Sequence, residues 1–104
     1  AKPLFIPLMR QYFEAFKNGT KRTEYRRYGR QWTEKHCTPG RPAILSLGYG
    51  KYERISATIV GFRVLDDEPG ETRIYPVGTK IAAIDLKLSR PARRKRRPRS
   101  CLVR

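Results

Sequence analysis

The stretch that decides the fold is residues 8–27, LMRQYFEAFKNGTKRTEYRR, because its hydrophobic period changes partway along. Its first part repeats apolar residues at intervals of three and four, which predicts a helix over residues 8–18 with one buried face. The residues of that face are Met9, Tyr12, Phe13 and Phe16. Asn18-Gly19 ends the helix, since glycine readily adopts the left-handed conformation after a helix C-terminus. We predict a strand over residues 23–27, in which Thr23, Tyr25 and Arg27 would face one side and Glu24 and Arg26 the other.

Apolar segments on both sides of this stretch predict further strands. The expected strands are residues 4–6, 43–47, 55–65 and 80–88. Residues 55–65 form the longest β-branched segment, which predicts a central strand that is bent or bulged at Gly61. Residues 29–42 look irregular, with Trp32 as an anchor. Because no crossover helices separate the later strands, the order favours an α+β fold. The expected architecture is an antiparallel, partly closed barrel with one packed N-terminal helix, rather than any parallel sheet.

Positive charge is abundant and unevenly placed. The chain has 104 residues, with 24 Lys or Arg against 9 Asp or Glu, and a formal charge of +15. Eight of the basic residues and none of the acidic ones fall in residues 89–104. Such a segment repels itself and has little apolar surface to bury, so we expect it to be disordered. The chain therefore divides into one domain, residues 1–88, and a basic tail, residues 89–104, which excludes a multidomain enzyme.

The sequence offers little sign of a membrane, disulfide or metal role. Its apolar runs are far shorter than the ~20 residues that span a bilayer, and we see no signal-peptide pattern. We therefore expect a cytoplasmic protein without membrane insertion. Cys37 and Cys101 do not make a disulfide framework, and with His36 they are too few for a structural zinc site. We expect no cofactor and no metal, and the sequence leaves the oligomeric state undefined.

Lys21, Glu24 and Arg26 form the candidate site, because they lie within six residues of one another just after a tight turn. On a strand, Glu24 and Arg26 share a face, and Lys21 can fold over it. Arg26 offers a planar fork of donors to a phosphate or a base edge, while Glu24 can accept from an amino group. A partly buried Lys21 could also act as a base or nucleophile, with Glu24 as its acid–base partner. The simpler alternative is a surface ion-pair network, with each pair worth ~0–1 kcal/mol.

Residues 17–41 carry eight basic residues against two acidic ones, with aromatic residues between them. Cationic side chains contact phosphates, and aromatic rings stack on unpaired bases at about 1–3 kcal/mol each. We therefore predict contact with RNA, to which the tail would add non-specific affinity for RNA or DNA. The predicted nucleic-acid-binding residues are Lys21, Arg22, Arg26, Arg27, Arg30, Trp32, Tyr49 and Lys51. The alternative is a solvated basic face that meets an acidic protein.

The turn between the strands at 43–47 and 55–65 has the sequence Tyr49-Gly50-Lys51-Tyr52. It predicts a hairpin whose tyrosines frame the pocket, although a bare turn explains the glycine equally well. Just before it, we expect Ser46 to alternate outward from its strand rather than to face the site.

Residues 12–26, YFEAFKNGTKRTEYR, resemble the motif of ASCH domains, a small β-barrel family similar to the PUA RNA-binding domain. The family's mark is a helix, a glycine turn and a Lys-x-x-Glu-x-Arg segment, which Lys21, Glu24 and Arg26 match. The later strands of the family resemble residues 41–50, 57–65 and 81–88, so the resemblance covers about residues 3–88.

This resemblance implies RNA binding and, in some members, hydrolysis. Members of the family cut single-stranded RNA or remove the acetyl group from N4-acetylcytidine. The deacetylating branch shares the lysine at Lys21 but has a threonine where this chain has Glu24. The sequence thus favours an RNA-binding protein with its pocket near Lys21, Glu24 and Arg26. It leaves open a hydrolase of RNA or of a modified nucleoside, and a basic protein-interaction module.

Overall fold

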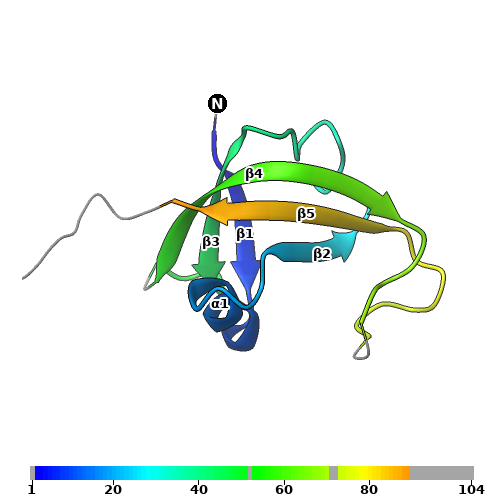
Figure 1. Ribbon diagram of the computed structural model, residues 1–104, viewed down its shortest axis with the longest axis horizontal. Helices are drawn as coiled ribbons and strands as arrows, with labels where there is room; N and C mark the ends of the chain where they lie inside the picture. The colour runs from blue at the N-terminus through cyan, green and yellow to red at the C-terminus, as the bar shows by residue number, and fades with distance from the viewer. Residues whose placement is uncertain (1, 52, 71–72, 90–104) are drawn as a thin grey trace, which may run out of the picture.

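All of the strands join one sheet, in the spatial order β1-β3-β4-β5-β2, with one short helix beside it (Figure 1). This computed structural model describes residues 2–51, 53–70 and 73–89. The elements in chain order are β1 (Leu4–Leu8), α1 (Arg10–Lys17), β2 (Thr23–Arg27), β3 (Pro42–Leu47), β4 (Arg54–Leu65) and β5 (Ile81–Leu88). The structure therefore confirms each of the predicted elements to within a few residues.

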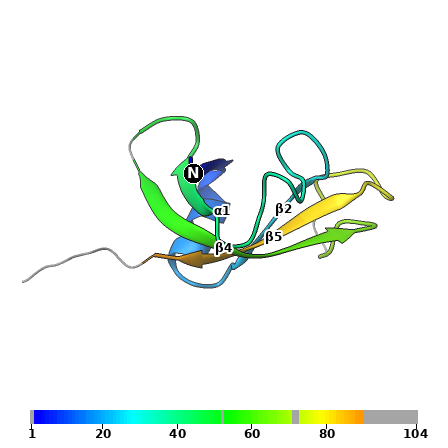
Figure 2. The same ribbon diagram turned by 90° about the horizontal axis from the view of Figure 1, so that it is seen from above.

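The sheet curls into a half-barrel because β4 belongs to both of its halves. The first part of this 12-residue strand pairs with β3, and the part from Ala57 onward pairs with β5. The register shifts between Ile59 and Gly61, which confirms the predicted bulge, and a bulge increases the local bend of a strand. Seen from above, β4 bends between the part of the sheet beside α1 and the part that contains β5 and β2 (Figure 2).

Gly61 occupies the bend because it faces a carboxylate at close range. A Cβ at this position would lie 2.7 Å from Oδ2 of Asp85. Oδ1 of Asp85 accepts hydrogen bonds from the Thr23 hydroxyl at 2.6 Å and from Arg63 at 2.9 Å, so a shift of this carboxylate would disturb both bonds. The missing side chain at Gly61 therefore allows β2, β4 and β5 to be joined through one carboxylate.

Gly61→Ala is accordingly expected to lower the free energy of unfolding by about 1–3 kcal/mol, the usual cost of forcing an extra methyl group into a packed site. The neighbouring Val60 side chain is exposed, so Val60→Ala serves as a matched control with a loss within about 0.5 kcal/mol. Urea denaturation measures both variants. Equal stabilities for the two would contradict the close contact with Asp85.

The core lies between the curled sheet and α1. Its fully buried helical residues are Phe13 and Phe16, which pack on alternate residues of β1 and β3. The strand residues of this core are Leu4, Ile6, Leu8, Ala43, Leu45, Ala57, Ile59, Ile84 and Leu86. The prediction for Met9 was wrong, since its side chain is 61% exposed. Met9 has an extended backbone just before the first turn of α1, so it does not follow the helical period.

The expectation of a sheet without parallel pairs was also wrong. β1 runs parallel to β3, with Leu4 opposite Ala43 and Leu8 opposite Leu47, whereas the other three pairings are antiparallel. A parallel pair needs a long crossover connection, and here α1, β2 and residues 28–41 together supply it. The sheet is a half-barrel with two separate edges, β1 and β2.

In the part of the chain that the structure describes, no helix is long and apolar enough to cross a membrane. The expected basic tail lies outside the described residues, apart from Ser89.

Candidate functional site

The two edge strands of the half-barrel approach each other, and one side chain spans the gap between them. In the described residues β1 pairs only with β3, and β2 pairs only with β5. Arg26 of β2 donates a hydrogen bond through Nη2 to the backbone carbonyl of Pro7 in β1. Proline suits an edge strand because it has no backbone N–H to pair. The contact places Arg26 at the open side of the sheet.

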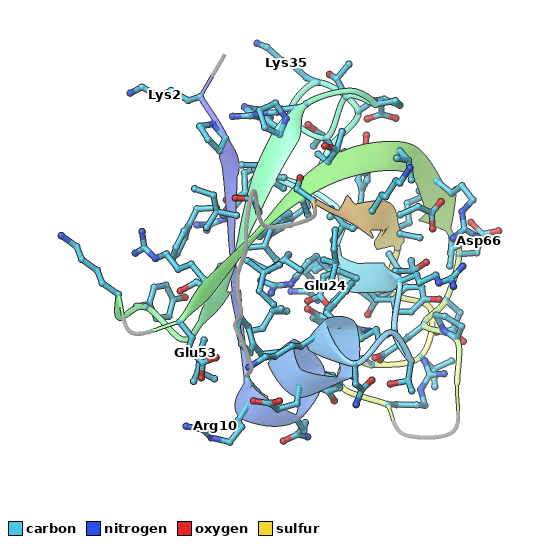
Figure 3. The ribbon with its side chains drawn as sticks, turned by 60° about the vertical axis from the view of Figure 1, so that its left-hand side comes forward. Lys2, Arg10, Glu24, Lys35, Glu53 and Asp66 are labelled. Carbon is cyan, nitrogen blue, oxygen red and sulfur yellow. The ribbon has the colours of Figure 1, made fainter. Side chains whose placement is uncertain are left out.

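Glu24 lies at the centre of this arrangement and is almost fully buried (Figure 3). Its Oε2 accepts a hydrogen bond from Nε of Arg26 at 2.6 Å. Its Oε1 lies 3.7 Å from Nζ of Lys21. Glu24 and Arg26 therefore share one face of β2, as the alternation predicted, and Lys21 reaches back over them from the turn. The three side chains are 9–20% exposed, so this cluster is not the solvent-exposed ion-pair network that we considered as the simpler alternative.

Aromatic rings hold the two cations of the cluster in place. Nζ of Lys21 lies 5.1–5.5 Å from three ring centroids, and the guanidinium carbon of Arg26 lies 4.8 Å from that of Trp32. The three rings around Lys21 are those of Tyr12, Phe16 and Tyr25. A cation over the face of an aromatic ring is attracted by the electrons of that face. Trp32 and Tyr25 thus contact the protein's own cations, a role that the sequence analysis did not assign to them.

Three hollows that share lining residues adjoin the cluster, and we call them together the edge groove. The first, of about 380 Å³, contains Glu24 and Arg26 in its wall. It shares Tyr12, Glu24, Tyr25 and Ile74 with a second hollow of about 280 Å³, which also reaches Lys21. It shares Pro7, Arg26 and Tyr49 with a third of about 460 Å³, which reaches Arg30 and Trp32. The edge groove therefore extends on both sides of the Lys21, Glu24 and Arg26 cluster.

The predicted nucleic-acid-binding residues do not all lie on this groove. Arg30, Trp32 and Tyr49 line it together with the cluster. Arg27 is exposed and lines none of the hollows described, because strand alternation turns it away from Glu24 and Arg26. Arg22 lines a separate hollow, and Lys51 is exposed in the turn between β3 and β4. Arg22, Arg27 and Lys51 therefore do not line the edge groove, and their contact with RNA stays a prediction.

Sequence reasoning missed the loop between β4 and β5, which supplies one wall of the edge groove. Glu68 is buried, and its Oε1 accepts hydrogen bonds from the backbone N–H groups of Ile74 and Tyr75, both at 2.8 Å. Ile74 and Tyr75 line the groove. Residues 66–70, DDEPG, are visibly an acidic turn in the sequence, but their spacing gives no sign that a carboxylate would bond to amides further along the same loop.

Ser46 was also placed incorrectly. It is fully buried rather than outward-facing, and its hydroxyl donates a hydrogen bond to the Gly50 carbonyl at 3.3 Å. This bond stabilises the turn that carries Tyr49. The Tyr49 ring is 83% exposed and lies 6.2 Å from the Phe5 ring, centroid to centroid, so it is available at the mouth of the groove.

No three His, Cys, Asp or Glu side chains of the described residues gather in a way that could hold a metal ion. No known family model matches the chain, and a search of curated proteins finds no significant match. The ASCH and PUA-like assignment of residues 3–88 therefore stays a prediction, and the geometry of the edge groove carries the functional argument.

Proposed function

We propose that this protein binds single-stranded RNA, with an unpaired nucleotide seated in the edge groove. The observation that carries this proposal is the buried Glu24 held between Lys21 and Arg26 at the wall of the groove. In the lining of the edge groove, the cations Lys21, Arg26 and Arg30 outnumber the carboxylates of Glu24 and Glu68, which leaves a net positive charge there. A carboxylate kept in place among cations suits a ligand that carries both a phosphate and hydrogen-bond donors, as a nucleotide does.

The chemistry of each side chain fits a nucleotide. Arg26 has five N–H donors, and its contacts with Glu24 and Pro7 leave others for a phosphate or a base edge. The Glu24 carboxylate has about four lone-pair positions, so it can still accept from an amino group of a base. The central hollow, of about 380 Å³, falls within the ~300–1,000 Å³ typical of small-ligand sites.

Single strands suit the groove better than duplexes do. A base in a duplex is stacked and paired, so its faces and Watson–Crick edge are hidden, whereas an unpaired base can enter a pocket and stack on aromatic side chains. Tyrosine rings line the groove from several elements, and in our proposal they provide the stacking surfaces. These tyrosines are Tyr12, Tyr25, Tyr49 and Tyr75.

Tyr49 gives the cleanest test, because a change at this exposed ring should leave the fold intact. Tyr49→Ala is expected to weaken single-stranded RNA binding by about 1–3 kcal/mol, or roughly 5–150-fold, which is the usual contribution of one stacked base. Tyr49→Phe keeps the ring and should bind like the wild type. Fluorescence anisotropy with the full chain measures both, with duplex RNA and duplex DNA beside the single strand at two salt concentrations. Equal affinity of the alanine and phenylalanine variants would contradict stacking at Tyr49.

The same titrations separate the other two hypotheses. Shortened RNA after incubation with the wild type, but not with Lys21→Ala, would favour the hydrolase with Lys21 and Glu24 as its acid–base pair. Loss of all nucleic-acid binding at physiological salt would favour a basic module that meets an acidic protein, since non-specific electrostatic binding falls steeply with salt. Our proposal expects intact RNA and a preference for the single strand that persists at the higher salt.

A further inference from the structure

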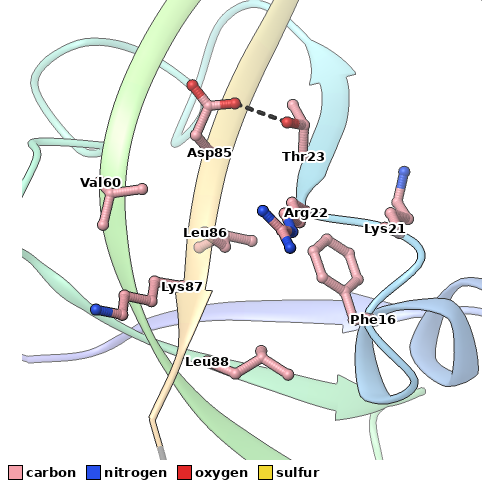
Figure 4. A pocket seen from close by; sticks show the side chains of 10 residues that line it. Phe16, Lys21, Arg22, Thr23, Val60, Asp85, Leu86, Lys87 and Leu88 are labelled. Atoms are coloured by element: carbon pink, nitrogen blue, oxygen red, sulfur yellow. Dashed lines mark hydrogen bonds between the residues drawn. The ribbon is translucent and has the colours of Figure 1, made fainter.

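A separate hollow of about 670 Å³, which is not part of the edge groove, lies beside the last residues of β5 (Figure 4). It is bounded by the turn between α1 and β2 and by the bulge of β4 at Val60. Its apolar floor is formed by Val60, which is exposed, by the half-buried Leu88, and by the buried Phe16 and Leu86. We call it the β5 hollow.

The charged residues of the β5 hollow are mostly cations. Arg22 and Lys87 are exposed at its rim, and within the described part of the chain neither lies in a salt bridge. The acidic residue in its lining is Asp85, whose carboxylate is already bonded to Thr23 and paired with Arg63. Burial raises the pKa of Asp85, but these hydrogen bonds outweigh burial and hold the pKa below its ordinary value. The charge of Asp85 is thus balanced by Arg63, and Arg22 and Lys87 remain available to an anion.

One residue connects this hollow with the edge groove. Lys21 lines the β5 hollow, and it also lines the part of the edge groove next to Glu24. A ligand longer than one nucleotide that leaves the edge groove past Lys21 therefore meets the β5 hollow next. The combination of an apolar floor and a cationic rim suits a unit with a flat base or sugar and a phosphate, which is the repeating unit of a nucleic-acid strand.

We propose that the β5 hollow binds a neighbouring nucleotide of the same RNA strand, with a phosphate at Arg22 and Lys87 and the base or sugar over Val60 and Leu88. This inference rests on the proposed function of the edge groove. It extends the binding site from a single nucleotide to a path over the edge groove and the β5 hollow. It also gives Arg22 a contact with RNA that does not depend on the face of β2 that carries Glu24.

The test compares two double variants of the full chain that remove the same charge. R22Q/K87Q removes both cations of the β5 hollow. The control, K2Q/K35Q, removes two cations that lie on the far side of the molecule from α1 (Figure 3). All of these side chains are exposed, so both variants should fold as the wild type does. The probes are uridine monophosphate and a uridine octanucleotide, each titrated by calorimetry over a series of salt concentrations.

We expect R22Q/K87Q to bind the octanucleotide about 10-fold or more weakly than K2Q/K35Q does. Its plot of log affinity against log salt should be shallower by about 1.4, which corresponds to two lost phosphate contacts on a single strand. The two variants should bind the mononucleotide equally. Equal octanucleotide affinity and slope for the two variants would overturn the β5 hollow alone. So would a loss of mononucleotide affinity in R22Q/K87Q as large as its loss of octanucleotide affinity. A wild type that binds neither probe would overturn the edge groove, and this inference with it.

Discussion

Replacing Glu24 by alanine is expected to lower the free energy of unfolding by about 2–4 kcal/mol and to abolish binding of RNA in the edge groove. Breaking a buried ion pair from one side usually costs about 3–5 kcal/mol, because the remaining charge is left unpaired. Lys21 and Arg26 both keep some contact with solvent, so the cost here falls somewhat lower. Binding is lost because no carboxylate then accepts from the base, and the two cations lose the group that fixes them relative to each other.

Two further variants accompany Glu24→Ala: one separates the charge of Glu24 from its shape, and the other is a control at an exposed ion pair. Glu24→Gln keeps an oxygen for the hydrogen bond from Arg26, so it should destabilise the protein less than alanine does. Glu53→Ala removes the partner of an exposed ion pair with Lys17, and should cost no more than about 1 kcal/mol. Urea denaturation gives the three stabilities, and RNA titration is made where circular dichroism shows a folded protein. If Glu24→Ala were as mild as Glu53→Ala, the buried cluster would not stabilise the sheet.

Replacing Arg26 by lysine is expected to weaken binding of single-stranded RNA by about 10–100-fold, although the charge is kept. The planar guanidinium of Arg26 bonds to Glu24 and to the Pro7 carbonyl at once, and it lies over the Trp32 ring. A lysine ammonium is a compact, strongly hydrated charge that cannot make the same forked contacts while stacking on a ring. The two edge strands would then lose the side chain that joins them.

The neighbouring Arg27 provides the matched control, because it lies on the same strand and is exposed on the other face. Arg27→Lys should leave RNA affinity unchanged. Anisotropy titrations of both variants with the same single-stranded RNA, made in parallel, compare them directly. Similar losses for Arg26→Lys and Arg27→Lys would mean that RNA contacts β2 through charge alone, without the edge groove.

The sequence predicted those features that depend on local periodicity. The alternation of residues 23–27 was enough to put Glu24 and Arg26 on one face, because side chains along a strand point to alternate sides. Gly19, with φ of +88°, ends α1 as expected. A glycine within a β-branched run predicted the bulge of β4, where the sheet bends. Each of these depends on a few consecutive residues.

The features that the sequence did not predict depend on contacts between distant segments. The parallel pairing of β1 with β3 follows from the path of the whole intervening chain. The Arg26 bond to Pro7 exists only because the sheet curls until its two edge strands face each other across a gap. Glu68 shapes the groove through amides of its own loop, and no pattern of residue types marks that arrangement. The composition of residues 17–41 likewise showed much positive charge, but not that Arg22 and Arg26 lie in different hollows.

The most direct test of the central claim is an NMR titration of the full isotope-labelled chain with a short single-stranded RNA, following the backbone amides. The account predicts that the largest shifts fall on residues of the edge groove, namely Tyr12, Glu24, Arg26, Tyr49 and Ile74. The amide of Lys35, a residue that lines none of the hollows described, should hardly move. If the RNA instead shifted only amides of residues 89–104, the basic tail would be the RNA-binding element, and the edge groove would have no part in it.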